Sequence, residues 1–226
     1  MTGEVLLQAE GLRRGFGGVV AVDGITLTVR AGDRLAVVGP NGAGKTTLLN
    51  LLAGTLHPTA GRIHWCGRDI TRHGPARRSR AGIGRSFQTP TVLPTLSTLD
   101  NLVVAAWPHR PGWWPPARLQ RLRSEAVGSL ASFGLTARSG APASVLSHGQ
   151  QRLLDIAMAM AGSPRLLLLD EPAAGLDGAD LARLLDLLAA APRELAIVLV
   201  EHQLDVVAAV ATSVVELRHG RVVPAC

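Results

Sequence analysis

The sequence predicts an α/β fold, because apolar runs of strand length alternate with longer segments of helical spacing. Residues 166–169 and 196–200 are continuous apolar runs, as expected of strands that are covered on both faces of a parallel sheet. A helix-like segment over residues 179–191 separates them. A strand-like run over residues 34–38 leads through a glycine-rich loop into a predicted helix over residues 46–53.

Shorter elements are predicted at the two ends of the chain. Runs over residues 5–9 and 25–29 are rich in β-forming residues and are bounded by glycine-rich turns. Residues 214–217 and 221–223 flank Gly220 and predict a hairpin.

The middle of the chain differs in composition, since prolines and tryptophans precede a helical pattern over residues 118–133. We expect a helical subdomain over residues 89–160. Within it, the region of Trp113 and Trp114 is interpreted either as an exposed loop or as an interface for a partner.

Length and composition exclude several classes of protein. A chain of 226 residues with 47% apolar and 18% charged residues is one large domain, or one domain with a subdomain, and is neither disordered nor fibrous. No apolar run approaches the roughly 18 residues that cross a bilayer. Cys66 and Cys226 cannot make a disulfide framework and the chain starts without a signal-peptide pattern, so a reducing cytosol is expected. The net charge of +6 favours anionic partners such as nucleotides, anionic lipid or nucleic acid.

The most specific motif is a glycine-rich loop over residues 39–46, which reads GPNGAGKT and fits G-x-x-x-x-G-K-[ST] between a predicted strand and a predicted helix. Backbone N–H groups of such a loop point at phosphate oxygens, and the helix N-terminus adds positive charge. Lys45, the only lysine in the chain, is expected to reach the β and γ phosphates, while the Thr46 hydroxyl binds Mg²⁺. The residues predicted to bind nucleotide here are Gly39, Pro40, Asn41, Gly42, Ala43, Gly44, Lys45, Thr46 and Thr47.

Two acids, Asp170 and Glu171, end the leucine run over residues 166–169. Burying a strand up to adjacent carboxylates is costly unless a cation or a bound substrate needs them. Taken alone, the pair is an ordinary acidic turn. Together with the phosphate loop it predicts that Asp170 orients Mg²⁺ and that Glu171 polarises the attacking water.

A second candidate phosphate site lies at residues 146–152, which read LSHGQQR and open a helix-like run over residues 152–162. Ser147 is a favourable helix cap, and free N–H groups at a helix start bind anions. A plain helix cap is the alternative, and it is the better one for this segment in isolation.

The order of these blocks resembles that of ATP-binding cassette (ABC) ATPases, in which a phosphate loop, a glutamine, an LSGGQ-type signature, an acidic strand end and a histidine recur in this order. The resemblance covers essentially the whole chain. It implies a P-loop NTPase core, with a mixed sheet and an antiparallel N-terminal β-subdomain, and an inserted α-helical subdomain. The core would comprise residues 1–88 and 161–226, and the helical subdomain with the signature would comprise residues 89–160.

The same resemblance implies roles for individual residues. Gln88 would contact Mg²⁺ and sense the γ phosphate, His202 would contact that phosphate, and Phe16 would stack on adenine. The signature residues Ser147, Gly149 and Gln150 and the loop residue Asp177 would act on the nucleotide of an opposite subunit; His148 departs from the commonest signature, which has glycine there. The implied catalytic residues are Lys45, Gln88, Glu171 and His202, and the implied Mg²⁺ ligands are Thr46, Gln88 and Asp170.

A finer resemblance is to the ATP-binding subunits of branched-chain amino acid importers and of the similar urea and short-chain amide importers. It is carried by residues 14–18, 85–88, 99–102, 170–176 and 201–202. It implies an ATP-hydrolysing subunit that uses ATP and Mg²⁺ and dimerises with an identical or sister cassette. Such a subunit would power solute import through a separate membrane permease, supplied by a solute-binding protein, at the cytoplasmic face of the cell membrane. The solute is chosen by other subunits in such systems.

Two other functions would fit parts of this sequence. A soluble ABC-type ATP switch acting on nucleic acid or on the translation machinery would need a tandem cassette, a coiled-coil insertion or a dense basic tail, which the sequence does not show; no nucleic-acid partner is therefore expected. A nucleotide-dependent module without turnover is disfavoured by Glu171 and His202. An arginine cluster is interpreted either as facing anionic headgroups or permease acids, or as a solvated basic face. It consists of Arg72, Arg77, Arg78, Arg80 and Arg85.

Overall fold

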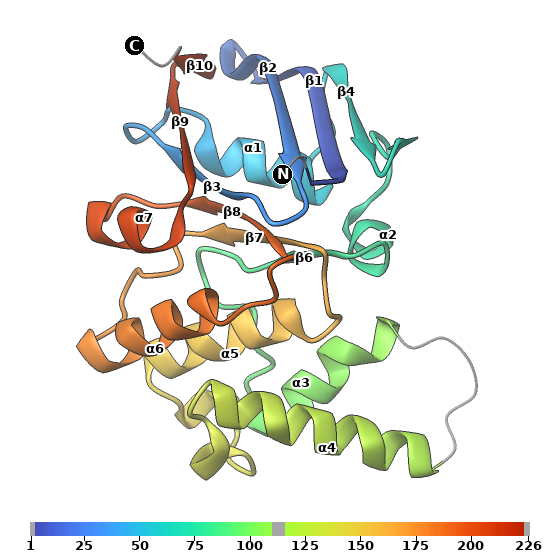
Figure 1. The fold of residues 1–226 in the computed structure, drawn as a ribbon, viewed down its shortest axis with the longest axis vertical. Coiled ribbons are helices and arrows are strands. Elements are labelled where there is room, and N and C mark those ends of the chain that lie inside the picture. The colour runs from blue at the N-terminus through green and yellow to red at the C-terminus, as the bar shows by residue number, and fades with distance from the viewer. Residues whose placement is uncertain (1–2, 110–115, 224–226) are drawn as a thin grey trace.

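The computed structural model describes residues 3–109 and 116–223, which form two β-sheets with helices around them (Figure 1). The predicted loop with Trp113 and Trp114 lies outside the described residues. Within the described ranges, no helix is both long enough and apolar enough to cross a membrane.

The first sheet is antiparallel and has the strand order β2-β1-β4-β5. Its strands are β1 (Val5–Phe16), β2 (Val19–Arg30), β4 (Ala60–Trp65) and β5 (Arg68–Asp69). β1 and β2 are longer than the predicted runs over residues 5–9 and 25–29, because Gly11 lies at a bulge within β1 rather than in a turn that ends the strand. Gly11 has a positive φ of 56°, as a glycine in a bulge often does.

The second sheet is mixed and has the strand order β10-β9-β3-β8-β7-β6. Its strands are β3 (Arg34–Val38), β6 (Ile83–Arg85), β7 (Leu166–Asp170), β8 (Ala196–Val200), β9 (Ser213–Arg218) and β10 (Arg221–Val223). The pairings of β3, β6, β7, β8 and β9 are parallel, and β10 pairs with β9 in the antiparallel hairpin that was predicted. The C-terminal ends of β3 and β7 therefore lie at the same edge, where Asp170 pairs with Val200.

The second sheet separates two hydrophobic cores. Along β7, Leu167 and Leu169 belong to the core on one face, whereas Leu166 and Leu168 belong to the core on the other. The first of these cores is built with α3 (Thr98–Ala106), α4 (Pro116–Ser132), α5 (His148–Met160), α6 (Gly178–Ala189) and α7 (Leu204–Val210). The other core contains α1 (Lys45–Ala53), which lies between the two sheets (Figure 1).

The short helix α2 (Pro75–Arg80) places one member of the arginine cluster in the interior. Arg78 is 1% exposed, so both interpretations of the cluster are wrong for this residue, while Arg72, Arg77 and Arg80 are exposed. Its guanidinium donates to the carbonyls of Leu51, Leu52, Ile70, Thr71 and His73 at 2.7–3.2 Å.

Arg78 thereby caps the phosphate-loop helix. The carbonyls of Leu51 and Leu52 lie in the last turn of α1, where backbone acceptors lack helical partners and carry the negative end of the helix dipole. Burial lowers the pKa of Arg78 to about 10, so the group is still charged at neutral pH. Helix α1 ends at Ala53, as predicted, and Gly54 caps it in a left-handed conformation.

Candidate functional site

Most of the residues predicted to bind nucleotide through the phosphate loop line one cleft of about 700 Å³ at the C-terminal edge of the second sheet, whereas Gly39 and Pro40 are not part of its wall. Ala21 also lines the cleft, and nothing in the sequence indicated it. The predicted residues along the wall are Phe16, Asn41, Gly42, Ala43, Gly44, Lys45, Thr46, Thr47, Gln88, Glu171 and His202.

The phosphate loop needs glycine at two positions. A Cβ atom at Gly39 would lie 2.2 Å from the carbonyl oxygen of Leu217, and one at Gly44 would lie 2.1 Å from that of Ala21. Both residues also have positive φ, 144° and 100° respectively, which side chains disfavour. The glycines of the motif therefore let the loop approach neighbouring backbone, as well as a phosphate.

Lys45 is 6% exposed, and its Nζ donates to the carbonyls of Gly39 at 2.8 Å and Pro40 at 2.9 Å. Burial lowers the pKa of Lys45, while the carboxylates of Glu171 and Asp170 act in the opposite direction. The ammonium group thus lies within the phosphate loop and beside the acidic end of β7, as the sequence predicted.

Asp170 is 1% exposed and is held from two sides. The Thr46 hydroxyl donates to its Oδ1 at 3.3 Å, and Arg85 makes an ion pair with its Oδ2, also at 3.3 Å. Burial raises the pKa of Asp170, and the nearby Arg85 opposes that shift. Arg85 has 7% of its side chain exposed, so for this residue too the arginine-cluster interpretations are wrong.

The side chains near Asp170 fit a magnesium ion. Hydroxyl, carboxylate and amide oxygens are its preferred ligands, and Thr46, Asp170 and Gln88 offer one of each. In the described part of the chain, no group of three or more His, Cys, Asp or Glu residues could hold a metal. Mg²⁺ takes few protein ligands and completes its shell with water and substrate phosphates.

Glu171 lies between two polar side chains that the sequence assigned to catalysis. Its Oε2 accepts from Gln88 Nε2 at 3.3 Å, and its Oε1 lies 3.1 Å from His202 Nε2. The backbone of Glu171 has a φ of 50°, in the left-handed region, and its N–H donates to the Val200 carbonyl at 2.9 Å. The carboxylate is therefore aimed by a turn that a non-glycine residue adopts only under constraint.

Phe16 lies at the rim of the cleft with 46% of its surface exposed. The guanidinium carbon of Arg14 is 4.9 Å from the centroid of the ring, within cation–π range. A large exposed aromatic ring beside the phosphate loop is suited to stack on a flat base.

The signature residues lie elsewhere. Ser147 caps α5 because its hydroxyl oxygen accepts from the Gln150 N–H at 3.1 Å. In return, the Gln150 side-chain oxygen accepts from the Ser147 N–H at 3.2 Å. Asp177 caps α6 by accepting from the Asp180 N–H at 2.8 Å. Neither these residues nor Gly149 line the cleft of their own chain. One chain therefore brings the phosphate loop, Gln88, Glu171 and His202 together but leaves the signature apart.

The signature and the loop before Asp177 are packed on each other. A Cβ atom at Gly175 would lie 2.7 Å from the His148 ring, and one at Gly149 would lie 2.5 Å from an oxygen of Asp180. The two glycines thus allow this close contact. His148, which replaces the commonest glycine of the signature, lies against this loop.

One acid that supports the site, Glu201, was singled out in the sequence only as the neighbour of His202 and was given no role. Glu201 is 3% exposed, and its carboxylate accepts from the N–H groups of Ala173 at 3.1 Å and His202 at 2.7 Å. It thereby joins the loop after Glu171 to the segment after β8. The only sign in the sequence is its position next to His202.

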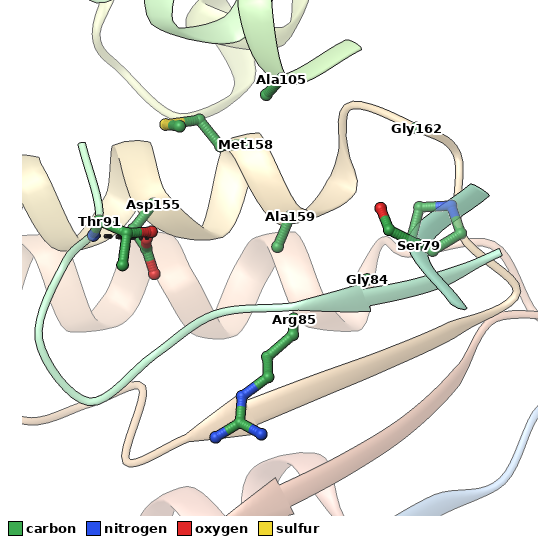
Figure 2. A pocket seen from close by; sticks show the side chains of 10 residues that line it. Ser79, Gly84, Arg85, Thr91, Ala105, Asp155, Met158, Ala159 and Gly162 are labelled. Carbon is green, nitrogen blue, oxygen red and sulfur yellow. Dashed lines mark hydrogen bonds between the residues drawn. The ribbon is translucent and has the colours of Figure 1, made fainter. Parts of the chain in front are cut away.

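A second cavity, of about 200 Å³, lies between β6 and α5 (Figure 2). Thr91, from the segment after Gln88, and Asp155, Met158 and Ala159 of α5 line it. Ala105 of α3 lies across from them (Figure 2). The cavity thus adjoins the segment that carries Gln88.

An ABC transporter family model matches residues 22–174. The chain belongs to the ABC transporter family. It is 34% identical over 226 residues to the high-affinity branched-chain amino acid transport ATP-binding protein BraF of Pseudomonas aeruginosa, with 95% of this chain and 89% of that protein covered. It is also 34% identical over 217 residues to a putative ribose/galactose/methyl galactoside import ATP-binding protein 3 of Burkholderia cenocepacia. That match covers 96% of this chain but 42% of the relative, so the chain spans less than half the length of such relatives.

Two solved structures agree with this assignment. A nucleotide-free ATP-binding cassette from an ABC transporter matches with a TM-score of 0.85 and 29% identity, covering 97% of this chain and 90% of that one. A cassette in its ADP conformation matches with a TM-score of 0.83 and 29% identity over 97% and 89% of the two chains. The predicted fold class is confirmed, and so is the predicted membership of the ATP-binding cassette family. The finer resemblance to amino acid importers is not distinguished, because the sugar-import relative is equally identical.

Proposed function

We propose that this cassette is the ATP-hydrolysing subunit of an ABC importer and that it closes around ATP with a second cassette. The observation that carries the proposal is the cleft itself. Lys45, Gln88, Glu171 and His202 line it together. The signature helix of the same chain lies outside it, as a half-site would.

The residues of the cleft have separate roles in phosphoryl transfer. The phosphate loop and Lys45 bind and neutralise the β and γ phosphates. Glu171 accepts a proton from the attacking water, and Gln88 and His202 fix the orientation of its carboxylate through the contacts at 3.3 and 3.1 Å. Magnesium, when bound by Thr46, Asp170 and Gln88, neutralises charge that develops on the phosphate oxygens.

The second cassette supplies the other half of the site. In a head-to-tail pair, Ser147, Gly149 and Gln150 of one copy would meet the nucleotide in the cleft of the other, and the loop with Asp177 would cross between them. A cassette of the same fold, with a TM-score of 0.88 and 23% identity, is described as dimeric. The partner is an identical copy or a sister subunit.

The cavity between β6 and α5 is the proposed contact for a separate membrane permease, which places the cassette at the cytoplasmic face of the cell membrane. The cavity adjoins the Gln88 segment, so a permease there would sense closure of the nucleotide cleft. On this proposal residues 1–88 and 161–226 form the catalytic core, and residues 89–160 form the helical subdomain that moves with the permease.

The proposed solute is a branched-chain amino acid or a related small amide, delivered by a separate solute-binding protein. The match to BraF supports this choice, because it covers 89% of that protein. A sugar is the alternative that the relatives raise.

The test is to isolate the intact complex from membranes and to measure ATP hydrolysis with candidate solutes. We expect a multi-span protein to co-purify, and branched-chain amino acids to stimulate hydrolysis through the complex. Stimulation by a sugar would overturn the proposed solute but not the proposed subunit. A cassette that purifies with no membrane protein would favour the alternative, a soluble ABC-type ATP switch.

Replacing Phe16 with Ala is expected to weaken ATP binding by about 10-fold or more, because base–aromatic stacking contributes about 1–3 kcal/mol. Phe16→Tyr keeps the ring and should bind ATP as the wild type does. Val19→Ala, at an exposed neighbouring position, is the matched control. Titration of the purified cassette with ATP and magnesium measures all four affinities; an unchanged affinity in Phe16→Ala would assign Phe16 a packing role only.

A further inference from the structure

The side chain of Arg152 in α5 donates hydrogen bonds to the backbones of the two segments that carry Gln88 and Glu171. The residue is 0% exposed. Its Nη1 donates to the carbonyls of Phe87 and, at 2.8 Å, Gln88. Its Nη2 donates to the carbonyls of Asp170 and Glu171, both at 2.5 Å. One planar guanidinium therefore joins the end of β6 to the acidic end of β7.

The contact with Glu171 bears on the direction of its side chain. The left-handed conformation of Glu171, with a φ of 50°, is unfavourable for a residue with a Cβ atom. A hydrogen bond from a buried charged donor to its carbonyl helps to offset that cost. Arg152 therefore helps to hold the turn that directs the carboxylate towards Gln88 and His202.

Asp155, on the next turn of α5, holds the same segment from its N–H side. It is 2% exposed, and its carboxylate accepts from the N–H of Phe87 at 3.2 Å. It also accepts from the N–H of Thr91 at 2.9 Å and from the Thr91 hydroxyl at 2.7 Å, as Figure 2 shows for this pair. Within residues 87–91, the guanidinium of Arg152 thus binds backbone carbonyls and the carboxylate of Asp155 binds backbone N–H groups.

We propose that Arg152 and Asp155 are positioning residues, which hold Gln88 and Glu171 in catalytic geometry as one unit with the signature helix. Helix α5 begins at His148, so the helix that presents the signature also carries the two side chains that hold the catalytic segments. A displacement of α5 would then move Gln88 and Glu171 together. This inference rests on the proposed roles of those two residues.

The first experiment compares variants of the full chain in steady-state ATP hydrolysis. Arg152→Lys keeps the charge but replaces the planar fork with a single ammonium, which cannot serve four carbonyls on two segments. We expect kcat to fall about 10- to 100-fold with the KM for ATP little changed, because small displacements of catalytic groups have effects of that order. Asp155→Asn, which presents an N–H to N–H donors, should show the same pattern with a smaller loss.

The matched control is Arg123→Lys, in which an exposed arginine of α4 loses part of its ion pair with Asp100. Its kcat and KM should equal those of the wild type. If Arg152→Lys does not fold, as judged by its melting temperature, Asp155→Asn decides the question alone. A normal kcat in the folded variants, or a rise in KM as large as the fall in kcat, would overturn the proposal.

The second experiment separates positioning from general support of the fold. If Arg152 acts through Glu171, then Arg152→Lys in a Glu171→Gln background should lower the residual hydrolysis by less than about 2-fold. An equal fold-loss in both backgrounds would show a structural role only. Near-normal turnover in Glu171→Gln alone would overturn the proposed role of Glu171, whereas a collapsed Glu171→Gln with a normal Arg152→Lys would overturn only this inference.

Discussion

Replacing Glu171 with Gln is expected to lower the rate of ATP hydrolysis by about 100- to 10,000-fold, which is the usual contribution of a general base. The amide has nearly the same size and can still hydrogen-bond to Gln88 and His202, but it cannot take a proton from water. ATP binding should survive, because Lys45 and the phosphate loop are unchanged. An ATP-bound pair of cassettes should therefore accumulate, which size-exclusion chromatography with ATP and magnesium would detect.

Glu4→Gln is the control for this experiment, because it removes an exposed carboxylate that pairs with Arg165 at the protein surface. Its hydrolysis rate and its elution should match those of the wild type. Turnover of Glu171→Gln near the wild-type rate would remove Glu171 from the catalytic role. The base would then have to be sought among the other polar groups of the cleft.

Replacing Arg78 with Met is expected to lower the free energy of unfolding by about 3–5 kcal/mol, the loss typical of breaking a buried charged network. Methionine fills much of the same volume but donates no hydrogen bond. The carbonyls of Leu51, Leu52, Ile70, Thr71 and His73 would each lose a donor. Urea denaturation followed by circular dichroism measures the change.

Arg77→Met provides the comparison, since Arg77 is the exposed neighbour in the same helix. Its unfolding free energy should change by no more than about 0.5 kcal/mol. Equal stabilities of the two variants would mean that the carbonyl contacts of Arg78 contribute nothing net to the fold.

The sequence predicts the central sheet well because its strands are buried on both faces. β8 has the predicted bounds, and β7 extends one residue beyond its apolar run, to Asp170. The long strands of the first sheet were harder, because the prediction took the β-rich runs to be bounded by glycine-rich turns. β1 instead continues past Gly11, where the pairing with β2 shifts register.

The site is predictable where a short motif determines local geometry, as at Lys45 and Thr46. It is not predictable where an arginine is buried. Arginine is usually exposed, and nothing near Arg78 or Arg152 in the sequence indicates that backbone carbonyls of distant segments will surround it. The place of Ser147 outside its own cleft was implied only by the resemblance to ABC ATPases, because the order of motifs along the chain does not by itself show where they lie in the fold.

The alternation along β7 makes the sheet a partition between two interiors. Side chains on one face of the sheet belong to a different core from those on the other face, as Leu167 and Leu168 show. Polar groups that connect the helices of one core to the cleft, such as Arg152, therefore lie at the edge of the sheet, where the strands end. The sheet that separates the two cores therefore also determines where contacts between the helices and the cleft can form.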